Sequence, residues 1–130
     1  MRNILKAKSQ NLGKLGESIA VKHLVKHRYR IVEKNFRKPW GEIDIIATQK
    51  NVLVFVEVKA LTSSVIFKPE DHFTRQKTER LLRTCRLYTE RLRQDTRWRI
   101  DLIAIEFKQN YSRCELRHIE GVETSFENHL

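Results

Sequence analysis

The stretch that most constrains the fold is WGEIDIIATQKNVLVFVEVKA, residues 40–60. Its two apolar runs are rich in β-branched and aromatic residues and are separated by the polar pair Gln49-Lys50, a pattern that predicts a β-hairpin with a short loop. Four charged residues interrupt the apolar runs, namely Glu42, Asp44, Glu57 and Lys59. A buried sheet keeps charged residues only where they have partners, so the hairpin is also the first place to look for a functional site.

Strand geometry predicts that these polar side chains converge on one face of the hairpin. Residues two apart along a strand share a face, and directly opposed residues of antiparallel strands also share one. With Gln49 and Lys50 as the loop, Thr48 pairs with Asn51 and Asp44 is diagonal to Glu57. A slip of one residue would move the two acids to opposite faces, so the site depends on this register.

A divalent cation would explain why the acids are kept together. Opposed and diagonal carboxylates repel each other, whereas Mg²⁺ takes one or two carboxylates and keeps several waters, which Asp44 and Glu57 would satisfy. Lys59, on the face of Glu57, would orient a water or meet developing negative charge, and Glu42, opposite Glu57, would orient its neighbours. The alternative is a solvated face on which Lys59 only neutralises Glu57; the apolar character of residues 52–58 favours the cation.

The remaining sequence predicts one α/β domain with a mixed sheet flanked by helices, in the order αβββαββ. Helical spacing of apolar residues covers 12–26 and 74–92, with Thr74 as the N-cap of the second helix. Strands are expected at 29–37, 97–107 and 112–120 in addition to the hairpin, residues 61–71 are expected to form a loop, and residues 1–10 and 121–130 are expected to form an arm and a tail.

The charge balance favours a polyanionic partner. The chain has 130 residues, with 26 Lys and Arg against 16 Asp and Glu, giving a formal net charge of +10. Such an excess favours nucleic acid as the first candidate for this partner. No export signal or membrane-spanning run is expected, and the two cysteines, Cys85 and Cys114, belong to no paired motif, so we expect a cytoplasmic protein without a membrane partner.

Several motifs in order resemble a known family. The segments LGKLGESIAVKHL, NFR, GEIDIIA, LVFVEVK and RQKTERL occur in the order seen in the YraN-like family of small bacterial proteins, over about residues 11–107. That family is assigned to the restriction-endonuclease-like, or PD-(D/E)XK, nuclease superfamily and is similar to archaeal Holliday-junction resolvases. The resemblance implies a restriction-endonuclease-like core and phosphodiester hydrolysis that depends on Mg²⁺ or Mn²⁺.

By position, the resemblance assigns roles to particular residues. It implies that Asp44 and Glu57 are catalytic metal ligands, that Lys59 is the catalytic amine, and that Glu17 in the first helix is a further metal ligand. An acid in the first turn of a helix, favoured by the helix dipole, is the alternative for Glu17. Gln76 matches a polar position that lines the site in relatives, with an ordinary helix-surface residue as its alternative.

The second predicted helix carries the candidate phosphate contacts, and its basic residues could equally form an ordinary solvated face. These candidates are Arg75, Lys77, Arg80 and Arg83. His23 and His27, one helical turn apart, could bind a transition metal, but no third ligand is evident and surface histidines are the simpler interpretation.

The sequence therefore predicts a divalent-metal-dependent endonuclease that hydrolyses phosphodiester bonds in DNA, ahead of RNA, with branched or otherwise structured DNA as a substrate. The alternative is a nucleic-acid-binding module that has the nuclease fold but no catalysis. A homodimer is compatible with either function.

Overall fold

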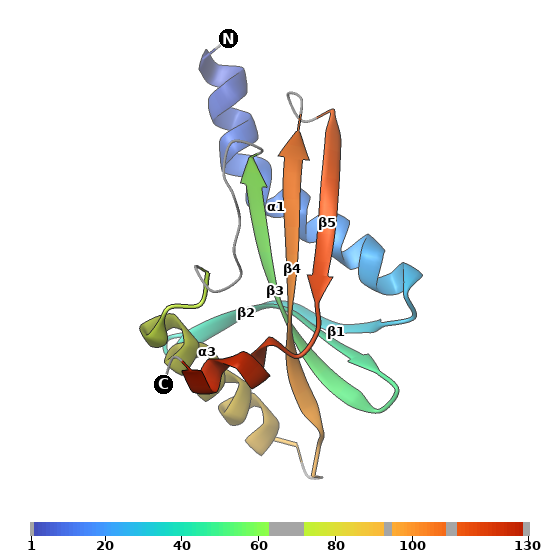
Figure 1. Ribbon diagram of the computed structural model, residues 1–130, viewed down its shortest axis with the longest axis vertical. Coiled ribbons are helices and arrows are strands. Elements are labelled where there is room, and N and C mark those ends of the chain that lie inside the picture. Colours follow the sequence, from blue (N-terminus) through green and yellow to red (C-terminus); the bar gives the residue numbers. More distant parts are fainter. Residues whose placement is uncertain (1, 63–71, 93–94, 109–111, 129–130) are drawn as a thin grey trace.

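A mixed five-stranded sheet lies between two helices, as the ribbon of the computed structural model shows (Figure 1). The structure describes residues 2–62, 72–92, 95–108 and 112–128, with only the backbone described for 2–10, 127 and 128. The elements are α1 (Arg2–Lys26), β1 (Arg30–Lys38), β2 (Gly41–Gln49), β3 (Val52–Thr62), α3 (Arg75–Glu90), β4 (Trp98–Lys108), β5 (Arg113–Ile119) and the 3-10 helix η1 (Val122–Asn128).

The strands lie in the sheet in chain order, β1-β2-β3-β4-β5. Neighbours are antiparallel except for β3 and β4, which are parallel because α3 forms the crossover between them. This confirms the predicted α/β class and the order αβββαββ. Most of the expected loop, residues 63–71, lies outside the described residues.

The predicted register of the β2–β3 hairpin is wrong by two residues. Gln49 pairs with Val52, so the turn residues are Lys50 and Asn51 and not Gln49 and Lys50. Lys50 and Asn51 have φ values of 49° and 64°, the left-handed conformation that two-residue hairpin turns require at both positions. Asn tolerates this conformation well, which explains why it belongs to the turn. A shift of two residues keeps each side chain on its predicted face.

One face of the sheet is covered by α1. Ala20 and Leu24 are fully buried against Val54, Val56 and other apolar residues of the central strands. The backbone of α1 approaches closely at Gly16, where an added Cβ would lie 3.1 Å from the Cβ of Ala60. Two residues of the predicted apolar stripe are instead 46% and 57% exposed, namely Leu15 and Val25.

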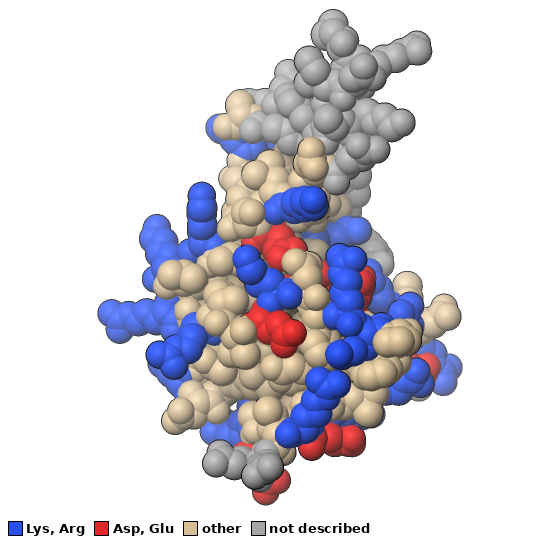
Figure 2. All heavy atoms as spheres, turned by 180° about the vertical axis from the view of Figure 1, so that it is seen from behind, with Lys and Arg blue, Asp and Glu red and all other residues tan. Residues whose placement is uncertain are grey.

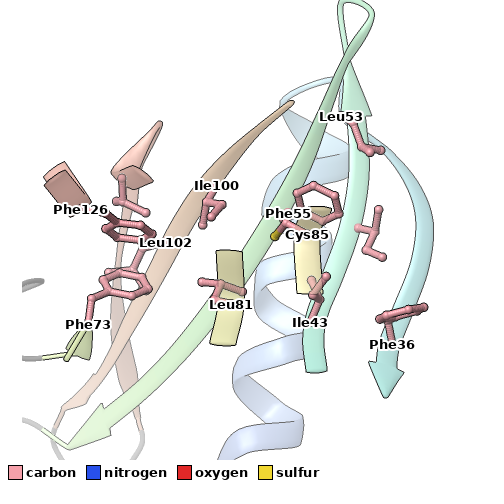
Figure 3. Packing of buried hydrophobic residues seen from close by; sticks show 12 residues of the cluster. Phe36, Ile43, Leu53, Phe55, Phe73, Leu81, Cys85, Ile100, Leu102 and Phe126 are labelled. Atoms are coloured by element: carbon pink, nitrogen blue, oxygen red, sulfur yellow. The ribbon is translucent and has the colours of Figure 1, made fainter. Parts of the chain in front are cut away.

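The other face is covered by α3 and η1. Leu81 and Cys85 of α3 pack against Phe55 of β3 and its neighbours (Figure 3). The predicted N-cap of α3 is confirmed, because the Thr74 hydroxyl accepts a hydrogen bond from the Lys77 backbone N–H. Leu92, expected on the buried stripe, follows the last residue of α3 and is 39% exposed.

The C-terminal segment, which the sequence predicts to be a tail, instead contributes η1 to the hydrophobic core on the α3 side of the sheet. Phe126 of η1 is 2% exposed, and its ring centroid lies 5.0 Å from that of Phe73. The Glu123 carboxylate accepts a hydrogen bond of 2.8 Å from the Ile100 backbone N–H at the start of β4. Within the described residues, no helix is both long and apolar enough to cross a membrane.

Candidate functional site

The site lies where β2 and β3 separate. Their backbone pairing ends at Ile45 and Val56. One residue earlier on β2, the Asp44 carboxylate accepts a hydrogen bond of 2.8 Å from the Val58 backbone N–H, so a side chain takes the place of the ladder. Ile43 packs in the α3-side core whereas Ile45 packs in the α1-side core, although they are two residues apart. The strand therefore twists sharply at Asp44.

Glu57 follows Val56, the last residue of β3 that pairs with β2, and it faces α3. Its side chain is 13% exposed. Burial raises the pKa of Asp44 to about 7, with Glu57 adding to the shift and the hydrogen bond from Val58 opposing it. Burial likewise raises the pKa of Glu57 to about 7, against the opposing charge of Lys77. Two acids that ionise near neutral pH are typical of a site built to receive a cation or a proton.

His72, which the sequence interpretation missed, completes this cluster. It directly precedes α3, its side chain is 5% exposed, and its Nε2 lies 3.8 Å from Glu57 Oε2. That Nε2 is buried without a hydrogen-bond partner among the described residues, while Nδ1 lies 3.4 Å from Lys77 Nζ. Burial lowers the pKa of His72 to about 4, with Lys77 and Lys59 adding, so the ring is neutral at pH 7. No short motif in the sequence marks this histidine.

The other predicted site residues lie at different distances from Asp44 and Glu57. Lys59 is partly buried on the α3 side of β3, where its charge acts on His72. Glu42 is exposed and lies 3.8 Å from the guanidinium of Arg37 on β1, although its charge still raises the pKa of both buried acids. Glu17 is partly buried on α1 and accepts a hydrogen bond of 3.0 Å from the Asn35 amide.

A pocket of about 100 Å³ opens beside Glu57. Glu57 lines it from the sheet, and Lys77 and Arg80 line it from α3. Of the other predicted phosphate contacts, Gln76 and Arg83 line a separate groove on the outer side of α3, and Arg75 forms an ion pair of 3.3 Å with Glu79. The first half of α3 thus places basic side chains both beside Glu57 and on the outer surface of the helix.

The chemistry of the donor set fits a divalent ion such as Mg²⁺ or Mn²⁺. Asp44 and Glu57 are hard oxygen donors whose pKa values stay raised despite the nearby Lys77, and the pocket has room for the waters that Mg²⁺ retains. Within the described ranges, no three His, Cys, Asp or Glu side chains are grouped closely enough to hold an ion. Glu17 as a further ligand therefore stays a prediction.

The mixed sheet flanked by helices, with paired acids at the point where two strands part, defines the class as α/β proteins with a restriction-endonuclease-like core. The model of the "Uncharacterised protein family UPF0102" matches residues 16–105, and the chain belongs to this family, which is the YraN-like family that its motifs resemble.

Full-length relatives support the same assignment. A UPF0102 protein of Thermodesulfovibrio yellowstonii is 40% identical over 110 residues, which cover 85% of this chain and 93% of the relative. A UPF0102 protein of Geobacter metallireducens is 38% identical over 120 residues, which cover 92% and 94% respectively. These names identify the family and carry no statement of activity.

Proposed function

We propose that this protein is a divalent-metal-dependent nuclease that hydrolyses phosphodiester bonds in DNA, including branched or structured DNA. The observation that carries the proposal is the pair of neighbouring acids, Asp44 and Glu57, whose pKa values are both raised to about 7. Glu57 lines a pocket that the basic residues Lys77 and Arg80 also line. A basic protein with a net charge of +10 is suited to a polyanionic substrate.

Each residue has a distinct role in this proposal. Asp44 and Glu57 hold the ion, which when bound supplies Lewis-acid stabilisation of charge on the phosphate. The Val58 N–H fixes the orientation of the Asp44 carboxylate. Lys59, on the same face as Glu57, meets the negative charge that develops on phosphate oxygens, as preorganised cations do in phosphoryl chemistry.

The cations of α3 position the DNA backbone. Lys77 and Arg80, which line the pocket, contact the phosphates nearest the acids. The residues of the outer part of the helix contact phosphates further along and give affinity rather than sequence preference. These outer residues are Arg75, Gln76 and Arg83.

The test is cleavage of labelled linear, flapped and four-way-junction DNA in Mg²⁺ or Mn²⁺. Asp44→Asn is the matched variant, because an amide oxygen can still accept the hydrogen bond from Val58 while the charge is lost. Loss of an ion contact worth several kcal/mol should reduce cleavage by roughly 100-fold or more. Absence of cleavage with every substrate, or equal cleavage by Asp44→Asn, would contradict the proposal.

A non-catalytic nucleic-acid-binding module is the second candidate, and the outer groove of α3 favours it. Gln76, Arg83 and Arg86 line this groove and not the pocket of Glu57, so they can contact phosphates without the acids. This function predicts DNA binding in EDTA that is unchanged in Asp44→Asn and reduced in Arg83→Gln, together with no cleavage in either metal.

A further inference from the structure

A second polar cluster lies on the α1 side of the sheet, centred on Asp101 of β4. Asp101 is fully buried and accepts hydrogen bonds from Arg99 Nε at 2.9 Å, from His118 Nε2 at 2.8 Å and from the Gly121 backbone N–H at 3.1 Å. Burial alone would raise the pKa of Asp101, but the hydrogen bonds from His118 and Arg99 hold it below its ordinary value. Asp101 is therefore a carboxylate, and His118 Nε2 carries the proton between them.

This arrangement determines the protonation of His23 on α1. With the proton of His118 on Nε2, where the Asp101 carboxylate accepts it, the Nδ1 of His118 is the acceptor in this chain of hydrogen bonds. His23 Nε2 lies 2.9 Å from that Nδ1 and must donate to it. The remaining nitrogen of His23, Nδ1, thus carries a free lone pair.

His27, one helical turn further along α1, is held in a complementary form. Its Nδ1 lies 2.8 Å from the backbone carbonyl of His23. A carbonyl only accepts, so Nδ1 carries the proton and Nε2 carries the lone pair. The rings of His23 and His27 have centroids 4.3 Å apart, inclined at 36°. Two imidazoles that share a metal at about 2.1 Å have centroids roughly 4.5 to 5 Å apart, so a small opening of the pair suffices.

We propose that His23 and His27 form a two-histidine site for a transition metal ion, of the Zn²⁺, Ni²⁺ or Cu²⁺ type, with water in the remaining positions. Each histidine donates its only N–H to a fixed acceptor and keeps its other nitrogen as a ligand, which is the arrangement that metal-binding histidines require. For His23 the acceptor is His118, which Asp101 orients in turn.

The charges around this pair decide which ions it selects. Lys26 lies close enough to act on His23, and the guanidinium of Arg99 balances Asp101, so the surroundings offer no excess negative charge to a hard cation. Imidazole binds Zn²⁺, Ni²⁺ and Cu²⁺ well, whereas Mg²⁺ requires oxygen ligands. The site is therefore separate in chemistry from the acids of Asp44 and Glu57, and it lies on the opposite face of the sheet.

Calorimetric titration of the untagged protein with Zn²⁺ tests the site. The background carries Asp44→Asn, which weakens the carboxylate site, and Cys114→Ser, which removes an exposed thiol. We expect one equivalent of Zn²⁺ to bind, at least tenfold weaker binding in His27→Gln, and binding about 10- to 100-fold weaker in His118→Gln, which alters only the orienting residue. Lys22→Gln, exposed on the same helix, is the matched control and should leave binding unchanged.

Absence of Zn²⁺ binding, or equal binding by His27→Gln, would overturn the proposal. His27 is exposed, so its variant should fold, which circular dichroism will verify. Imidazole ¹⁵N–¹H correlation spectra of the metal-free protein give a second test that needs no variant. We expect the proton of His27 on Nδ1 and those of His23 and His118 on Nε2, and a proton on Nε2 of His27 would contradict the assignment.

Discussion

Asp44 and Asp101 are two partly or fully buried aspartates of one sheet whose pKa values are displaced in opposite directions. Asp101 has a guanidinium at 2.9 Å, which holds its pKa below the ordinary value against the effect of burial. Asp44 has a single backbone N–H and the nearby Glu57, so burial raises its pKa to about 7. The first aspartate stabilises the fold as an anion, whereas the second is destabilised as an anion until a cation arrives.

The raised pKa values of Asp44 and Glu57 predict that the metal-free protein loses stability as pH rises. Their unfolded values are near 4, so the native state binds more protons between about pH 4 and 7, and the free energy of unfolding falls across that range. Asp44→Asn should be more stable than the wild type at pH 8 by about 1 to 3 kcal/mol, and this advantage should shrink towards pH 4. Urea unfolding at several pH values measures both effects.

The metal provides the control for this prediction. At pH 8, millimolar Mg²⁺ or Mn²⁺ should raise the stability of the wild type and leave that of Asp44→Asn nearly unchanged, because only the native wild type binds the ion. Because the lowered pKa of His72 acts in the opposite direction, the decisive quantity is the difference between Asp44→Asn and the wild type. A difference that does not grow between pH 5 and pH 8 without metal would show that Asp44 is ionised at little cost.

Replacing Asp101 should destabilise the protein, in contrast to replacing Asp44. In Asp101→Asn the guanidinium of Arg99 loses its charged partner in a mostly buried setting, which typically costs 3 to 5 kcal/mol. Because the pKa of Asp101 is held below its ordinary value, its contribution should be present above about pH 4 and be lost as pH falls further. Thermal unfolding at pH 7 should show the cost, and a change below 1 kcal/mol would contradict it.

At the scale of elements, α3 is docked on the sheet through a glycine at the start of β2. Gly41 is buried, and an added Cβ there would overlap the side chain of Thr84 on α3. Thr84 is fully buried, and its hydroxyl donates to the Arg80 backbone carbonyl at 2.8 Å. The contact therefore sets how closely α3, with Lys77 and Arg80, approaches the acids.

This contact predicts a coupled pair of substitutions. Gly41→Ala should destabilise the fold by about 1 to 3 kcal/mol through overpacking. Thr84→Ala should remove most of that cost, so the two changes should be non-additive in a double-mutant cycle. Gly13→Ala is the control, since its added Cβ meets nothing within 4 Å. Equal costs of Gly41→Ala with Thr84 present or absent would exclude the contact as the cause.

Most of the elements and three residues of the candidate site could be proposed from sequence because they depend on local pattern. Apolar spacing located the strands and much of both helices, although residues 2–10, expected as an arm, belong to α1. Charged residues inside apolar runs singled out Asp44, Glu57 and Lys59 as candidates. The hairpin register was misjudged because turn conformation, not hydrophobicity, decides whether Gln49 or Asn51 belongs to the turn.

Residues brought together from distant elements could not be predicted. His72 lies 3.8 Å from Glu57 although the two residues are 15 positions apart in the sequence. The chain of hydrogen bonds from Asp101 through His118 to His23 joins β4, β5 and α1, which no spacing in the sequence relates. The same holds for the burial of Phe126, since its partner Phe73 is 53 positions earlier in the numbering.

At the scale of the whole molecule, basic side chains lie on both faces of the sheet, one of which Figure 2 shows. On the face turned away in Figure 1, basic side chains surround a few acidic ones (Figure 2). On the α3 side, basic residues line both the acid pocket and the outer groove. Under the proposed function, long-range attraction brings a polyanion to the molecule, and the cations of α3 hold it.

This distribution predicts the salt dependence of DNA binding under the proposed function. The logarithm of the affinity should fall linearly with the logarithm of the salt concentration, and each phosphate contact removed should reduce the slope by about 0.9 for duplex DNA. Arg80→Gln with Arg83→Gln should reduce the slope by roughly 2, whereas Lys22→Gln, exposed on α1, should leave it unchanged. Fluorescence anisotropy from 50 to 300 mM salt measures this, and equal slopes would place the DNA elsewhere.

The two-residue turn at Lys50 and Asn51 has a consequence for natural variation in this family. The turn is remote from the acids, yet it fixes which residue of β2 faces which residue of β3. Inserting or deleting a single residue there would exchange the faces of one strand and separate Asp44 from Glu57 without altering either residue. We therefore expect the number of residues between these two acids to differ among functional homologues only by even numbers. Whether that number is odd or even should be conserved more strictly than the residues of the turn itself.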